Sequence, residues 1–320
     1  MSLRAAVDVK PASPAHAPVS VSPPPGSPAI IVPSLGHSWA ERFSQAVLDT
    51  DLVGSLEVYG EAPSWEDRWF CLEFTAMNEP PSDLLDSWCQ SWDAHVLPFL
   101  VRGSVRARTG QAGAVEDLEY AASLDPTNPI PWGQLLVAAR TMGHPGADIE
   151  RFLAETVSRS ALYQPHVEFL LALGSDSTRT DLMIDFARSV SEVVPAGSPL
   201  HALVPIAALE SMILHQPDDH IEHLRANGLF DDVLMAAGQS VFHPGFIAEP
   251  SVPAAKAMNT FVVALSILGQ DDLGLLLADR IGSAVTDWPL SLLGSPTVST
   301  WQTLHDRLRD KGHQVAASRS

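Results

Sequence analysis

A repeated pattern of two helices joined at a glycine constrains the fold of this chain more than any other feature of its sequence. Helical patterns begin near four residues that stand 35, 34 and 35 positions apart, Leu97, Trp132, His166 and His201. The first three of these helices end at Thr109-Gly110, Met142-Gly143 and Leu173-Gly174. Because a lone hairpin of this size cannot bury its apolar face, this period predicts hairpins that stack into an α-solenoid with one continuous core.

Each predicted hairpin has a second, amphipathic helix, and these helices cover Ala114–Leu124, Asp148–Ser160 and Asp181–Val194. The segment Gly110–Pro129 resembles the second half of a tetratricopeptide repeat. Ala114 is small enough to allow a close helix approach, and Leu118 and Ala121 follow at helical spacing. Trp132 stands where the next such repeat carries a bulky aromatic residue. The resemblance implies a right-handed solenoid in which the first helix of each pair lines a concave groove.

Three further segments extend this resemblance, Leu182–Ser189, Ala196–Pro205 and Ala208–Glu210. Together with the repeat they are similar to a group of actinobacterial proteins that carry tetratricopeptide-like helices, over residues 85–240. That group has no assigned activity, so the resemblance implies the fold and leaves the function open.

The sequence outside the repeats differs in composition. Residues 1–36 hold eight of the 26 prolines, and such a segment buries too little apolar surface to order, so it is predicted to be a disordered tail. Residues 37–94 carry helical patterns that precede the repeats, residues 95–310 carry the repeats, and residues 311–320 are a C-terminal tail. The alternation typical of strands is absent from the sequence, which predicts an all-α chain of about ten to twelve helices.

Acidic residues outnumber basic residues, with 38 Asp and Glu against 19 Lys and Arg and a formal net charge of −19. Binding to phosphates or to an anionic bilayer needs clustered Lys and Arg, so neither a nucleic acid nor a membrane is an expected partner. The N-terminus lacks the apolar run of a secretory signal, and a cytoplasmic location is expected. Motifs for nucleotide binding and for a serine nucleophile elbow are missing, so no cofactor and no catalytic residue is assigned.

Four arginines stand out in this acidic sequence, Arg102, Arg106, Arg108 and Arg140. Arg102 and Arg106 are one helical turn apart, and Arg140 follows Arg106 after 34 residues, at the comparable place in the next repeat. Together with Trp132, the three residues Arg102, Arg106 and Arg140 predict a site that binds a carboxylate, such as a peptide C-terminus. The alternative is that these arginines are surface residues paired with the many acids, where each pair contributes little.

Two other clusters allow a different interpretation. His215, Asp219, His220 and His223 lie within nine residues, and imidazoles with a carboxylate at helical spacing can ligate zinc or iron. The alternative is a helix start with acids in its first turn. Five tryptophans also cluster in the sequence, and they predict either an aromatic core or a pocket for an apolar ligand: Trp39, Trp65, Trp69, Trp88 and Trp92.

The repeats, together with the missing catalytic motifs, favour a non-catalytic scaffold or regulator. We expect it to bind a protein or peptide with an acidic or C-terminal carboxylate in the concave groove. The other hypothesis is a helical enzyme or accessory protein of specialised metabolism, which would use the histidine cluster or the tryptophan pocket.

Overall fold

The computed structural model describes residues 34–143, 146–175, 177–246, 251–282, 284–294 and 298–318. Within these ranges the regular structure is helical, with seventeen α-helices, three short 3-10 helices and no strand. The predicted all-α class is therefore confirmed. The predicted number of helices was too low, because short helices such as α12 (His220–Ala226) and α16 (Asp287–Leu290) lie between the longer ones. The predicted tail lies outside the described residues except for 34–36, which form a turn.

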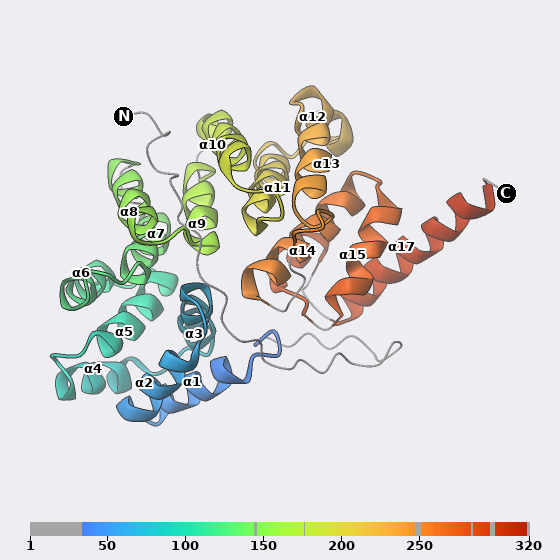
Figure 1. The fold of residues 1–320 in the computed structure, drawn as a ribbon. Coiled ribbons are helices and arrows are strands. Elements are labelled where there is room, and N and C mark those ends of the chain that lie inside the picture. Colours follow the sequence, from blue (N-terminus) through green and yellow to red (C-terminus); the bar gives the residue numbers. More distant parts are fainter. Residues whose placement is uncertain are drawn as a thin grey trace. The chain divides into compact units, whose positions relative to one another are not determined.

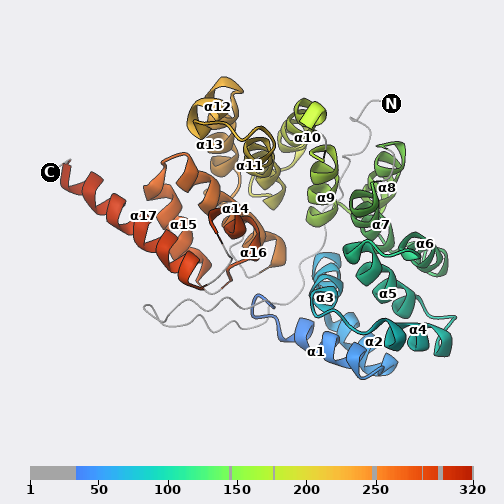
Figure 2. The same cartoon turned by 180° about the vertical axis from the view of Figure 1, so that it is seen from behind.

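The chain divides into two compact units. Unit 1 comprises His37–Ser175, and the main part of unit 2 comprises the described residues that follow 175. The division falls inside residues 95–310, which the sequence assigns to one repeat domain. The helices of both units are labelled in Figures 1 and 2.

Unit 1 begins with four helices that precede the predicted repeats, α1 (Ser38–Leu48), α2 (Leu52–Glu61), α3 (Trp65–Met77) and α4 (Ser82–Ser91). The start of α3 is fixed by Ser64, whose hydroxyl accepts a hydrogen bond from the Asp67 N–H. Such a cap satisfies one of the N–H groups that a helix start leaves without a partner. Helix α1 packs against α2 and α3, and α3 packs against the first helix of the repeats.

The segment of unit 1 that is predicted to hold repeats forms five helices. They are α5 (Val96–Thr109), α6 (Ala114–Leu124), α7 (Ile130–Met142), α8 (Gly146–Arg159) and α9 (Tyr163–Leu173). The first helices of the pairs start at 96, 130 and 163, so they are 34 and 33 residues apart. Helices α5 and α7 end at the predicted glycines, and Gly110 and Gly143 have positive φ of 65° and 71°. A left-handed residue at this place ends a helix and suits glycine. Helix α5 packs against both α6 and α7, and α7 packs against both α8 and α9 (Figure 1).

Small residues let these helices approach closely. A Cβ at Gly103 of α5 would lie 2.8 Å from Cγ of Leu118 on α6, so the two helices meet where the first has no side chain. A Cβ at Gly133 of α7 would overlap the indole of Trp69 and lie 2.9 Å from Cγ of Pro165. The aromatic residue of α3 therefore fills the space that glycine leaves on α7.

The main helices of unit 2 are α10 (Thr180–Val193), α11 (Leu203–His215), α13 (Leu229–Gln239), α14 (Val252–Ile267), α15 (Asp271–Ile281) and α17 (Val298–Ser318). Helix α11 packs against α10 and α13, and α14 packs against α15 (Figure 2). Helix α17 continues through residues 311–318, which the sequence assigns to a tail. Over the described ranges, no helix combines the length and the apolar character needed to cross a membrane.

Candidate functional site

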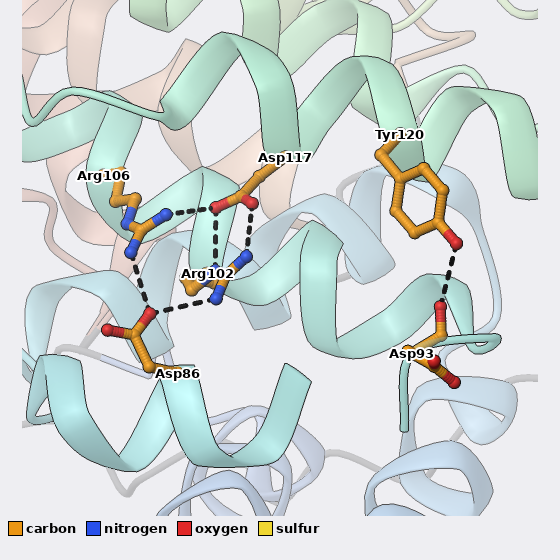
Figure 3. Close-up of polar contacts among 6 residues, drawn as sticks. All are labelled: Asp86, Asp93, Arg102, Arg106, Asp117 and Tyr120. Atoms are coloured by element: carbon orange, nitrogen blue, oxygen red, sulfur yellow. Dashed lines mark hydrogen bonds and ion pairs between the residues drawn. The ribbon is translucent and has the colours of Figure 1, made fainter. Parts of the chain in front are cut away.

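Arg102 and Arg106 lie in one cluster with two carboxylates (Figure 3). Asp117 of α6 accepts hydrogen bonds from Nε and NH2 of Arg102, at 2.9 and 2.6 Å, and from NH1 of Arg106 at 2.9 Å. Asp86 of α4 accepts from both arginines, at 2.9 and 2.8 Å. Next to this cluster, the Tyr120 hydroxyl donates to the carbonyl oxygen of Asp93. The cluster thus joins α4, α5 and α6 through two cations and two anions.

The charges in this cluster compensate one another within the chain. The side chain of Asp117 is 7% exposed, so its three hydrogen bonds form where water competes little. Burial opposes the charge of Arg102, but the hydrogen bonds to Asp117 and Asp86 together with the nearby negative charges outweigh burial. The pKa of Arg102 therefore lies above its ordinary value. These bonds use three donor atoms of Arg102 and two of Arg106. Both guanidinium groups are therefore committed to holding helices together.

A shallow groove lies along the first helices of the unit 1 repeats. It is lined by Trp69, Leu72, Glu73 and Ala76 of α3, Ser104 and Arg108 of α5, Gln134 and Val137 of α7, and Glu168 of α9. Its enclosed volume is about 10 Å³, which is room for about one water molecule. We call this surface the unit 1 groove. It is too small to enclose a small molecule, and its lining comes from four helices of unit 1.

Two arginines with free donor atoms are bound to carboxylates of the groove wall. Arg108 lines the unit 1 groove itself, and Arg140 lies next to it through its bond to Glu168. NH2 of Arg108 contacts Glu73 at 3.3 Å, and Nε of Arg140 contacts Glu168 at 2.9 Å. In both pairs the arginine side chain is the more exposed one. The exposed fraction is 38% for Arg108 against 14% for Glu73, and 36% for Arg140 against 8% for Glu168. A guanidinium has five N–H donors in a fork, and each arginine uses one nitrogen here. Among the described residues, the other nitrogens of Arg108 and Arg140 have no protein partner.

Trp132 lies away from this groove, at the start of α7. Its half-buried ring faces the guanidinium of Arg159, which is 5.3 Å from the ring centroid. Arg159 also donates to the carbonyl oxygen of Pro126 and pairs with Glu155 at 2.7 Å. None of the four predicted partner-binding residues lines the groove, and only Arg140 is next to it, through Glu168. Arg108, which is not one of the four, does line it.

The predicted metal ligands do not form a coordination site. Asp219 is the N-cap of α12 and accepts from the Glu222 N–H at 2.9 Å, while His220 is exposed. The rings of His215 and His223 lie 5.3 Å apart between centroids. In the described part of the chain, no group of three or more His, Cys, Asp or Glu residues could hold a metal ion.

The five tryptophans make separate contacts. Trp39 meets the edge of Phe70, Trp65 lies under the guanidinium of Arg68, and Trp92 meets His95. The remaining two, Trp69 and Trp88, are buried in unit 1. Trp39 and Trp65 are half-buried and Trp92 is 40% exposed, so only Trp69 and Trp88 belong to the core.

Two cavities of unit 2 are absent from the sequence-based predictions. The larger has a volume of about 380 Å³ and lies among α10, α11 and α13, where Ser191 and His201 face it. The smaller has a volume of about 260 Å³, and Ser211, His215 and His223 line it. Both bring a serine hydroxyl to a histidine ring nitrogen, at 2.8 Å for Ser191 and 2.9 Å for Ser211. No local motif marks these pairs, because each joins two elements across a loop.

Comparison with protein-family models gave no match for this chain, and a search of curated proteins also gave none. The candidate sites are therefore interpreted from their own geometry.

Proposed function

We propose that unit 1 is a tetratricopeptide-like, right-handed array of helical hairpins that binds a protein or peptide segment along the unit 1 groove. The nearly constant helix spacing supports the repeat assignment, since each first helix packs on its own partner and on the next first helix. The groove follows those first helices, which is the surface that such arrays present to peptides.

The observation that carries this proposal is that Arg108 and Arg140 are each bound through only one guanidinium nitrogen. Each has one nitrogen bound to a carboxylate of the groove wall, and each side chain is partly exposed, at 38% for Arg108 and 36% for Arg140. The less exposed partners Glu73 and Glu168 hold the two guanidinium groups in place. An arginine held in this way loses little side-chain entropy when it binds a second carboxylate.

The partner that fits is a segment with an acidic side chain or a free C-terminal carboxylate. Arg102 and Arg106 are unsuited to this task because Asp86 and Asp117 already occupy their donors. The chemistry is recognition without reaction.

The test uses the full chain and a random peptide library displayed with free C-termini. A selected peptide is measured by fluorescence anisotropy against the unchanged protein and the double variant Arg108→Ala, Arg140→Ala. Charge-assisted hydrogen bonds contribute about 1.5–3 kcal/mol each, so the double variant is expected to bind at least about tenfold more weakly. Amidating the peptide C-terminus is expected to weaken binding to the unchanged protein in the same direction.

Arg151→Ala is the matched control. Arg151 lies on α8, is 50% exposed, and pairs with Glu119 and Asp148 at 3.9 Å, so its loss removes an arginine away from the groove. Its affinity for the peptide is expected to equal that of the unchanged protein. Equal affinity of the double variant and the unchanged protein would show that the groove arginines bind no carboxylate, and would refute the proposal.

A further inference from the structure

A serine and a histidine of unit 2 are joined in a defined donor and acceptor arrangement. Ser191 lies in the last turn of α10, and His201 lies in the 3-10 helix η3 (Pro199–Ala202) that follows. Nε2 of His201 is 3.2 Å from the carbonyl oxygen of Pro195, and Nδ1 is 2.8 Å from Oγ of Ser191. Because a carbonyl oxygen only accepts, Nε2 carries the ring hydrogen. The lone pair of Nδ1 is then left to accept the hydrogen of the Ser191 hydroxyl.

The surroundings of His201 keep the ring in its basic form. The residue is 1% exposed, and burial lowers the pKa of His201, with the hydrogen bond to Pro195 acting in the opposite direction and His243 lowering the pKa further. The neutral ring is therefore the form present at neutral pH. A neutral imidazole next to a hydroxyl is the combination that general-base catalysis requires.

The cavity next to this pair has the size and the character of a small-molecule site. Its volume of about 380 Å³ lies within the range of about 300–1,000 Å³ for ligand pockets. Val194, Val204 and Ala236 supply apolar walls. The one arginine in the wall, Arg188, is already bound to Asp232 at 2.6 Å and to the carbonyl oxygen of Asn227. Glu192 adds a negative charge, so the wall does not favour an anion.

We propose that Ser191 is a nucleophile that accepts an acyl group from a small, uncharged carboxylic ester, with His201 as its general base. Ser191 Oγ attacks the carbonyl carbon while its proton moves to Nδ1 of His201. The bond from carbon to the leaving oxygen then breaks, and His201 returns the proton to that oxygen, which releases the alcohol. Water attacks the acyl-serine by the same proton route and releases the acid, so that atoms, charges and protons balance.

A second serine–histidine pair in unit 2 provides an internal comparison. Ser211 of α11 is 2.9 Å from Nε2 of His223, but Ser211 is 1% exposed, whereas Ser191 is half-buried and faces its cavity. A nucleophile must be reached by its substrate as well as activated. The structure therefore assigns reactivity to Ser191 and leaves Ser211 unreactive.

The experiment treats the full chain with an uncharged alkyl fluorophosphonate, which forms an Oγ–P bond as fluoride leaves with the serine proton. Mass spectrometry is expected to locate the label on Ser191. Ser191→Ala is expected to abolish both the label and the hydrolysis of p-nitrophenyl acetate. Ser189→Ala, which removes an exposed hydroxyl from the same helix, is the matched control and is expected to leave both unchanged.

His201→Gln separates the base from the hydrogen-bonding scaffold, because a glutamine side chain can donate and accept but is not a base at neutral pH. Its labelling rate is expected to fall by about 100-fold or more. A protein without label, a label on Ser211 or elsewhere, or full labelling of Ser191→Ala would each overturn the proposal. Ser191→Ala and Ser189→Ala decide the question even where His201→Gln does not fold.

Discussion

The two units are both built from paired helices, but they arrange their polar side chains in different ways. In unit 1 the arginines Arg102, Arg106, Arg108 and Arg140 are held by carboxylates of neighbouring helices. In unit 2 the serines Ser191 and Ser211 are held by histidines at the edges of cavities. The first arrangement presents charge along a surface, and the second places neutral polar groups beside enclosed space.

The difference follows from the spacing of the helices. First helices that start at 96, 130 and 163 repeat one packing geometry, and the groove between them encloses only about 10 Å³. In unit 2 the short elements η3 and α12 flank α11, and the cavities of about 380 and 260 Å³ lie beside it. Regular spacing fills the interior with side chains, and irregular spacing leaves volume that a ligand can occupy.

Removal of Asp117 tests the charge network of unit 1 with the largest expected effect. Asp117→Ala leaves two guanidinium groups that are 16% and 20% exposed without their main acceptor. The loss of one partner from a buried ion pair costs about 3–5 kcal/mol, and we expect about 3 kcal/mol here by urea denaturation. Asp86→Ala, at a carboxylate that is 42% exposed, is expected to cost less than about 1 kcal/mol. Equal costs for the two variants would show that burial does not set the strength of this cluster.

Glycine substitutions compare the packing of the two units. Gly133→Ala places a methyl group against Trp69 and Pro165, and overpacking of this kind costs about 1–3 kcal/mol. Gly238 of α13 has no heavy atom within 4 Å of an added Cβ, so Gly238→Ala in unit 2 is expected to raise stability by about 0.5 kcal/mol through helix propensity. Calorimetric unfolding of both variants measures the contrast. If Gly133→Ala leaves the free energy of unfolding unchanged, Trp69 does not pack tightly against α7.

The pH dependence of stability has the smallest expected effect. The pKa of His166 lies below its ordinary value of 6.5, because the effect of burial is larger than the opposite effect of the hydrogen bond to the backbone of Leu162. The unfolded chain therefore binds the proton more readily, so this contribution to stability is complete above pH 6.5 and is lost as the pH falls toward the native pKa. We therefore expect the free energy of unfolding to fall between about pH 7 and 5.5 because of this residue. His166→Gln is expected to reduce the slope, and an unchanged slope would contradict this assignment.

The sequence predicts the helices of unit 1 well because their ends depend on local residues. The glycines at 110 and 143 have positive φ, and α6 covers Ala114–Leu124 as predicted. Side-chain partners depend on distant residues, and here the repeat pattern misleads. Arg106 and Arg140 are 34 residues apart, yet Arg106 binds Asp86 of α4, a helix outside the repeat, whereas Arg140 binds Glu168 of α9.

The histidine cluster and the serine–histidine pairs show the same limit. A helix opened at Pro217 would place Asp219 and His223 on one face, but α12 begins only at His220 and Asp219 becomes its cap. Ser191 and His201 meet because the chain turns between α10 and η3. Neither helical nor strand periodicity encodes that turn, so no sequence pattern places the two residues together.

Hydrogen exchange of the full chain, with and without a selected peptide, shows whether the unit 1 groove is the binding surface. Exchange is expected to slow in α3, α5, α7 and α9, whose side chains line the groove, and to stay unchanged in α10, α13 and α15 of unit 2. Protection confined to unit 2, or to α6 and α8 without the groove helices, would show that the peptide binds elsewhere.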